Sequence, residues 1–335
     1  MKKCLLAICA SIAVLLAITP VQAMESWEPH LPGGAIGFAA GALPPEGFYF
    51  VDTQLFINSR VADAWGIQNS QEKLFCYVNA PTVLWATGCK IFGADYGVAL
   101  TEALVWTDFR VGTGLGPYGP ADTGDQWGLY NTVFNPGILS WKLPCDFRVK
   151  VGIPIFLDDG YHTVNDGLAS ITKIGPQRDL SKDGLNIYAP SAIGSTVFAP
   201  NVGISWLSHG FNLSADMWYG VSLKNTNIEY QSGDMFEMDL TGTYTCGKWT
   251  FGGGAAFALQ LQDDKYDAGD GTGYHSQPNS KETLIKAGPL IGYNFGPVSF
   301  FITCLLDVET KNAVFGNDVI AQIIVPLGGK DLFKH

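Results

Sequence analysis

The feature that most constrains this chain is an alternation of side-chain character with a period of two residues. In KWTFGGGAAFALQLQDD, residues 248–264, the odd positions from 249 to 261 are aromatic or aliphatic apart from Gly253, and the even positions from 248 to 262 are small or polar. A β-strand places alternate side chains on opposite faces, whereas a helix would mix the two sets on every face. This segment is therefore predicted to be a strand with one apolar face and one small or polar face.

The same alternation recurs in the segments 48–60, 147–155, 211–224 and 235–245. With weaker segments included, the chain is predicted to contain about twelve strands. The second and fourth of these, 72–86 and 128–141, alternate poorly. Their expected ranges are 48–59, 72–86, 94–106, 128–141, 146–157, 196–207, 211–224, 234–245, 248–262, 283–294, 298–309 and 318–327. Short turns alternate with long polar stretches at 60–71, 107–126, 158–195, 225–233 and 263–281.

This layout predicts an all-β fold, a transmembrane antiparallel β-barrel with short periplasmic turns and long extracellular loops. Hydrophobic residues make up 47% of the chain, yet no segment after residue 23 approaches the length of a spanning helix, and 40 glycines argue against a helical bundle. The alternative is a soluble β-sandwich, whose strands are usually shorter. Its outer faces would also carry more charge than the 15% of charged residues allows.

The N-terminal residues 1–23 have the layout of a cleaved secretory signal, with Lys2 and Lys3 before an apolar run that ends near Ala23. The expected organisation is a signal peptide (1–23), a Gly/Pro-rich segment (24–47), an outer-membrane barrel (48–327) and a tail (328–335). Loss of the two lysines changes the formal charge from −11 to −13, which disfavours nucleic acid as a partner. The expected partners are outer-membrane lipid, lipopolysaccharide, the barrel-assembly machinery and a small solute.

The residues on the polar face of the strands are candidates for lining the lumen. They are Asp52, Gln54, Asn58, Arg60, Arg148, Lys150, Asp216, Glu237, Asp239, Lys248, Gln260 and Lys286. Their mixed signs fit either a structural network of neutralising pairs or a charged constriction that selects solutes. Trp85, Trp106, Trp141, Trp206 and Trp249 fall near expected strand ends and fit aromatic girdles, whereas Trp218 has inward parity.

The apolar segment 24–47 is too rich in Gly and Pro for a strand. It is interpreted either as a flexible periplasmic lead or as a plug that folds into the lumen. In the second case Phe38 would form part of a site for a hydrophobic ligand.

No catalytic, cofactor or metal site is predicted. Gly252, Gly253 and Gly254 lie within a period-two strand without the Lys-Ser/Thr of a phosphate loop, and the aspartates of 263–270 do not match a calcium loop. His30, His162, His209, His275 and His335 are not expected beside a serine on an outward strand position. The five cysteines after residue 23 show no metal-ligand spacing, and whether Cys76 and Cys89 pair is left open.

Several stretches resemble the family of outer-membrane proteins named for the meta-pathway of phenol degradation. They are AAGALPPEGFYFVD (39–52), ADYGVAL (94–100), NIEYQSGDMFEMDLTGTYTCGKWTFGGG (227–254), LQLQDDK (259–265) and GPLIGYNFG (288–296). The chain departs from outer-membrane barrels in ending with GGKDLFKH, where Phe333 is not the terminal residue. The resemblance implies a barrel that passively takes up small hydrophobic or aromatic compounds. Alternatives from other classes are a non-conducting structural barrel and a lipid-acting barrel enzyme.

Overall fold

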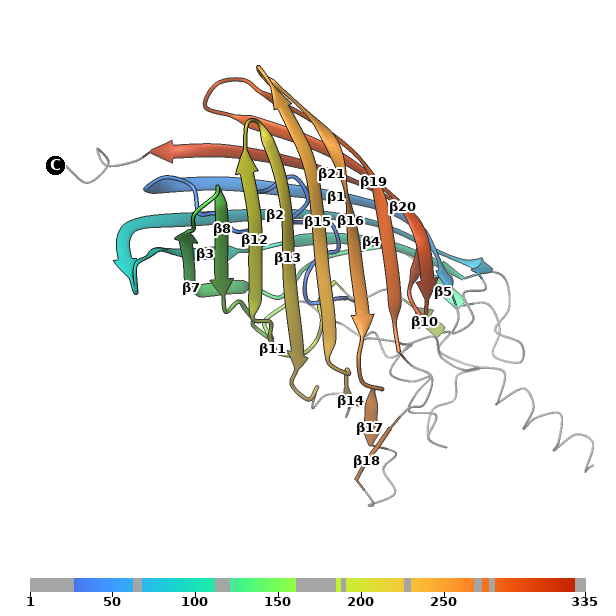
Figure 1. Cartoon of the computed structure of the whole chain (residues 1–335). Coiled ribbons are helices and arrows are strands. Elements are labelled where there is room, and N and C mark those ends of the chain that lie inside the picture. The colour runs from blue at the N-terminus through green and yellow to red at the C-terminus, as the bar shows by residue number, and fades with distance from the viewer. Residues whose placement is uncertain are drawn as a thin grey trace, which may run out of the picture.

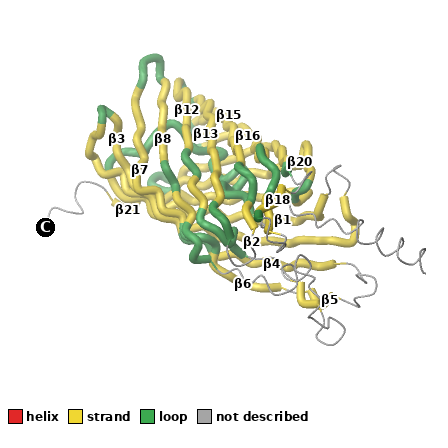
Figure 2. The backbone as a smooth tube through the Cα atoms, turned by 90° about the horizontal axis from the view of Figure 1, so that it is seen from below, coloured by secondary structure: helices red, strands yellow, loops and turns green. Residues whose placement is uncertain are grey.

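The structure is a computed structural model that describes residues 27–62, 68–111, 121–123, 125–160, 185–187, 191–225, 230–267, 273–276 and 281–328 (Figure 1). These residues form strands joined by turns and loops (Figure 2). None of the described segments is a helix long and apolar enough to cross a membrane. The expected signal peptide, most of the C-terminal tail, His162 and His335 lie outside the described residues.

The strands form a closed antiparallel barrel in which β1 pairs with both β2 and β21. The order around the ring is β1 (Gly47–Ala62), β2 (Gln68–Ile91), β3 (Ala94–Thr101), β7 (Val133–Lys142), β8 (Phe147–Gly152), β12 (Asn201–Ser208), β13 (Phe211–Ser222), β15 (Met235–Cys246), β16 (Trp249–Gln260), β19 (Thr283–Asn294), β20 (Ser299–Lys311) and β21 (Val314–Gly328). The described part of the chain therefore confirms the expected twelve strand positions. Closure leaves no open sheet edge around this ring, as a lipid environment requires.

Four short strands extend ring strands beyond a local break. They are β4 (Leu104–Val111) after β3, β6 (Asp125–Leu129) before β7, β9 (Ile155–Phe156) after β8 and β11 (Val197–Phe198) before β12. Pro154 and Pro200 lie at two of these breaks, because a proline has no N–H to donate to the ladder. The remaining strands are β5 (Ala121–Thr123), β10 (Leu185–Ile187), β14 (Tyr230–Gln231), β17 (Lys265–Asp267) and β18 (Tyr274–Ser276), which pair in two small sheets outside the ring.

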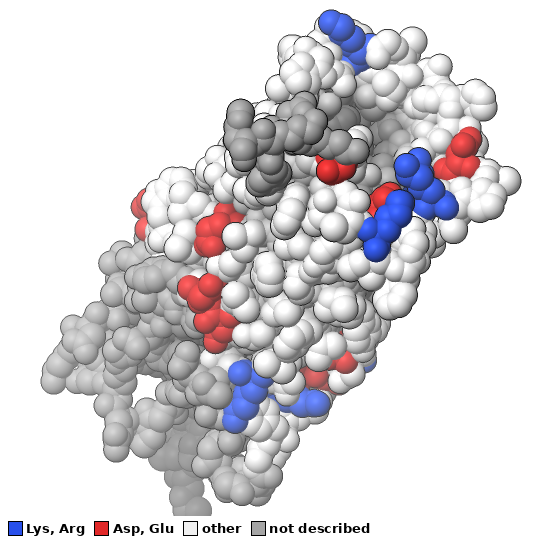
Figure 3. Space-filling model, turned by 90° about the vertical axis from the view of Figure 1, so that its left-hand side faces the viewer, with Lys and Arg blue, Asp and Glu red and all other residues white. Residues whose placement is uncertain are grey.

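The outer surface of the barrel is largely apolar. The side chains of Leu213, Phe251 and Leu306 are about half exposed, and charged groups are sparse on the face shown in Figure 3. Aromatic rings gather at the end with the short turns, where Phe48 stacks on Trp85 and Trp249 contacts Tyr293. An apolar band flanked by aromatic residues is typical of outer-membrane barrels.

Candidate functional site

The interior of the barrel contains the N-terminal segment, residues 27–46, which runs lengthwise through it. The backbone N–H groups of His30, Gly33 and Gly37 donate to Glu237, Asp239 and Thr241, which are successive inward positions of β15. Farther along, the Gly41 N–H donates to Ser205 Oγ at 2.7 Å. The segment therefore descends from the end with the long loops toward the short turns, where β1 begins.

Side chains of the barrel wall satisfy the backbone of this segment, which has no strand partner of its own. Asp239 accepts from the N–H groups of Gly33 and Ala35, each at 2.8 Å, and lies 3.0 Å from His30 Nε2. Asn212 on β13 and Gln322 on β21 donate to backbone carbonyl groups of the N-terminal segment. Because buried backbone groups need partners, these inward polar residues hold a segment that could not otherwise be buried.

Glycine is required where the segment approaches the wall. Gly33 has φ +88°, and a Cβ atom there would lie 2.5 Å from Leu305 and 2.8 Å from Ile320. On the wall, a Cβ at Gly203 would lie 2.1 Å from the Ala40 carbonyl oxygen. The glycines of both partners thus permit contact that any larger residue would block.

Two inward lysines form ion pairs with inward aspartates. Lys150 Nζ lies 3.3 Å from Asp216, and Lys286 Nζ lies 2.6 Å from Asp318 and 3.5 Å from Asp307. Arg148 shares the inward face of β8 with Lys150, and Gln260 is buried at the loop end of β16. This pairing supports the interpretation of a structural network more than that of an ion filter.

Five of the candidate lumen residues are placed elsewhere. Lys248 lies exposed in the turn between β15 and β16. The other four lie on the outward face of β1, and these are Asp52, Gln54, Asn58 and Arg60. The inward positions of β1 are instead apolar or hydroxyl-bearing, with Leu55 1% exposed in the same buried cluster as Ile36 of the N-terminal segment. The expectation of a polar inner face was wrong here because this part of the interior meets an apolar segment and not water.

A cavity of about 250 Å³ separates the N-terminal segment from the wall formed by β1, β2, β3 and β4. Aromatic rings from the segment and from the barrel border it: Trp27, Phe38, Tyr130, Phe156 and Trp218. Small aliphatic side chains complete the lining, among them Val78, Ala80, Ala103, Val105 and Val133. This cavity and its borders are called the aromatic cavity below.

Several polar groups around the aromatic cavity are hydrogen-bonded within the chain, whereas the buried indole N–H of Trp218 has no hydrogen-bond partner among the described residues. The Tyr130 hydroxyl donates to the Glu28 carbonyl oxygen at 2.9 Å, and the hydroxyls of Thr82 and Thr101 are 2.6 Å apart. The ring of His30 stacks on Trp218, with centroids 4.4 Å apart. The surface offered to a ligand is therefore mainly apolar and aromatic.

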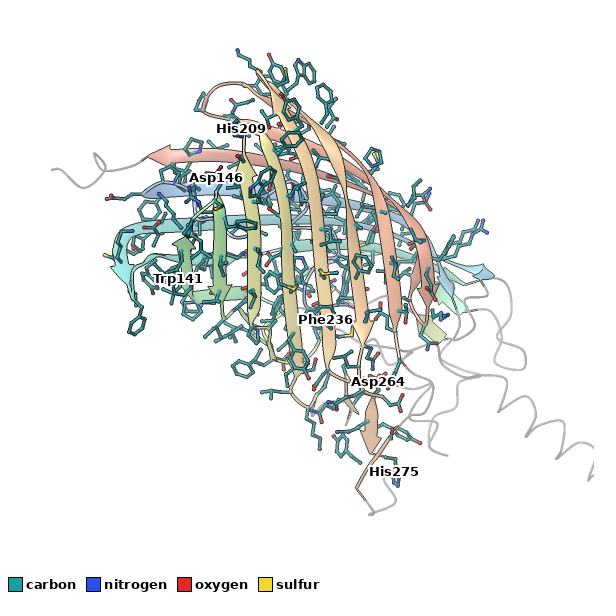
Figure 4. The ribbon with its side chains drawn as sticks, in the orientation of Figure 1. Trp141, Asp146, His209, Phe236, Asp264 and His275 are labelled. Carbon is teal, nitrogen blue, oxygen red and sulfur yellow. The ribbon has the colours of Figure 1, made fainter. Side chains whose placement is uncertain are left out.

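Carboxylates lie at the loop end of the interior. Asp264 is buried and accepts from the Gly233 N–H, and Figure 4 shows it at this end together with His275. Burial raises the pKa of Glu282 well above its usual value, and neighbouring Glu28 raises it further. Among the described residues no group of three or more His, Cys, Asp or Glu side chains is arranged to hold a metal ion.

A serine–histidine contact at the opposite end was missed in the sequence. Ser208 Oγ lies 2.8 Å from His209 Nδ1 and 2.7 Å from Asp146 Oδ2, near the short turns (Figure 4). In a catalytic triad the carboxylate orients the histidine, but here it binds the serine. This geometry fits a turn-stabilising contact.

The cysteines Cys76 and Cys89 do not pair with each other. Cys76 is buried, Cys89 is exposed near a turn, and both are free thiols.

The closed antiparallel ring, its apolar outer face and its filled interior define an outer-membrane β-barrel. The sequence profile of the family described as "Putative MetA-pathway of phenol degradation" matches residues 184–323, which confirms the family resemblance over that part of the chain. Comparison with curated protein sequences finds no match.

A solved structure has the same fold. The COG4313 outer membrane channel from Pseudomonas putida F1 superposes with a TM-score of 0.64 at 10% identity, covering 85% of this chain and 97% of that one. The CymD monoaromatic hydrocarbon channel is more distant, with a TM-score of 0.39, 12% identity, and coverage of 83% and 87%. Because the identity is only 10%, the likeness to the COG4313 channel establishes the fold alone.

Proposed function

We propose that this barrel is a passive outer-membrane channel for small hydrophobic or aromatic compounds, which pass through the aromatic cavity beside the N-terminal segment. The observation that carries the proposal is the cavity itself. Apolar cavities of roughly 150 Å³ stay dry and bind benzene, so a cavity of about 250 Å³ has room for a single substituted ring. The ring faces of Phe38 and Trp218 suit stacking with such a solute.

The aromatic cavity is expected to favour apolar solutes over polar ones. Polar solutes would lose hydrogen bonds to water on entering the cavity, because its lining is mainly apolar and the hydroxyls of Thr82, Thr101 and Tyr130 already have partners. Apolar solutes would gain from leaving water. A structural network of paired inward charges and uptake of neutral aromatic molecules are thus compatible in one barrel.

A cavity-filling variant tests this function. In proteoliposomes, Ala80→Phe is expected to slow the entry of toluene strongly, because the new ring occupies the cavity. Ala215→Phe is the matched control, since Ala215 points outward from β13 and the substitution should leave entry unchanged. Equal entry through both variants and the wild type would contradict the proposed route, and no protein-dependent entry at all would favour a non-conducting structural barrel.

A further inference from the structure

Three polar side chains form a cluster on the lipid-facing side of β1 and β2. Asp52 accepts a hydrogen bond from Asn79 Nδ2 at 2.7 Å and another from Gln54 Nε2 at 2.9 Å. Their neighbours in sequence, Thr53 and Val78, line the aromatic cavity on the inner side, so the cluster faces outward. We call Asp52, Gln54 and Asn79 the β1–β2 patch.

The β1–β2 patch lies within the apolar band, not at its edge. On the short-turn side Phe48 stacks on Trp85, and on the loop side Phe56 contacts Tyr77. The neighbouring strand β21 presents Ile323 opposite Asp52. Asp52 lies four positions along β1 from Phe48. At about 3.3 Å per residue and a tilt of about 40°, this places the carboxylate roughly 10 Å inside the aromatic girdle.

Lipid tails cannot complete the hydrogen bonding of this cluster. The Asp52 carboxylate can accept more than the two bonds it receives, and each amide has a second N–H and a carbonyl oxygen. Within the described residues these remaining groups have no hydrogen-bond partner in the chain. Polar groups that face lipid are costly in barrels, and in membrane proteins they usually meet other protein.

We propose that the β1–β2 patch is the contact between two copies of this chain, related by a two-fold axis along the membrane normal. Such an axis keeps equivalent residues of the two copies at the same depth in the membrane, so the patch of one copy can meet the patch of the other. Amide groups both donate and accept, which makes the cluster self-complementary: Gln54 and Asn79 of each copy supply donors to the other copy's Asp52. Small neighbours such as Pro81 and Ala321 allow the strands to approach.

Disulfide cross-linking of the full chain in liposomes tests this contact. In a background whose exposed cysteines are replaced by serine, Gln54→Cys is expected to cross-link most chains into dimers under mild oxidation. Ala215→Cys, an outward position in the middle of β13, is the matched control and should remain monomeric. Equal cross-linking of the two variants would overturn the proposal.

A second variant measures the contribution of the polar groups themselves. The triple variant Asp52→Leu, Gln54→Leu, Asn79→Leu is expected to halve the particle mass of the purified protein in nanodiscs, from two copies to one. Its barrel should stay folded, as shown by unchanged heat-modifiable mobility on gels. A wild type with the mass of one copy, or a triple variant that still has the mass of two, would refute the dimer. If the triple variant does not fold, the cross-linking result decides alone.

Discussion

Deletion of residues 26–46 is expected to raise the single-channel conductance of the reconstituted barrel severalfold. The N-terminal segment crosses the interior, so its removal opens a water-filled path along β15 and exposes Glu237 and Asp239. These two carboxylates should make the widened pore prefer cations. Planar-bilayer recordings with a salt gradient would measure conductance and selectivity together.

The full-length protein provides the control for the deletion, recorded at the same protein density. Unchanged conductance and selectivity would mean that the segment does not obstruct the pore. A larger conductance without cation preference would instead place the opened path away from β15.

Replacing Asp239 by leucine is expected to give the next largest effect. The change removes the acceptor of the Gly33 and Ala35 N–H groups and the partner of His30. Each buried donor left without a partner costs about 1–3 kcal/mol, so the bound position of the segment loses several kcal/mol. Recordings should show the full-length channel fluctuating between the closed level and the level of the deletion variant.

Two matched substitutions define how specific this effect is. Asp239→Asn keeps one acceptor oxygen and should open less often than Asp239→Leu. Asp216→Asn alters a carboxylate that binds Lys150 and Asn201 and not the segment, so its recordings should resemble the wild type. Frequent opening of Asp216→Asn would point to general loosening of the barrel and not to release of the segment.

The sequence predicts the barrel well because alternation with a period of two is a local property of each strand. Residues 235–246 and 249–260 have the expected faces, with Glu237 and Asp239 inward and Phe251 outward. The expected strands 146–157 and 196–207 ran unbroken through Pro154 and Pro200, whereas the structure breaks both there because proline has no N–H for the ladder. These features depend on residues that are close in the chain.

The candidate site was predicted less completely because it depends on what fills the lumen. Leu55 faces inward, where Ile36, nineteen positions earlier in the chain, belongs to the same apolar cluster. The expectation of polar residues on the inner face of every strand therefore failed for β1. The folding of 24–47 into the barrel was one of two open interpretations, and the backbone contacts to Asp239 could not be derived from composition. The Ser208–His209–Asp146 contact joins two turns that are distant in sequence.

The most direct test of the central claim is a crystal structure of the protein soaked with bromobenzene, recorded at the bromine absorption edge. An anomalous peak is expected within the aromatic cavity, between Phe38, Ala80 and Trp218. The peak should be absent in Ala80→Phe crystals that have the same unit cell. Bromine density only on the lipid-facing surface of wild-type crystals, with an empty cavity, would contradict the route through the aromatic cavity.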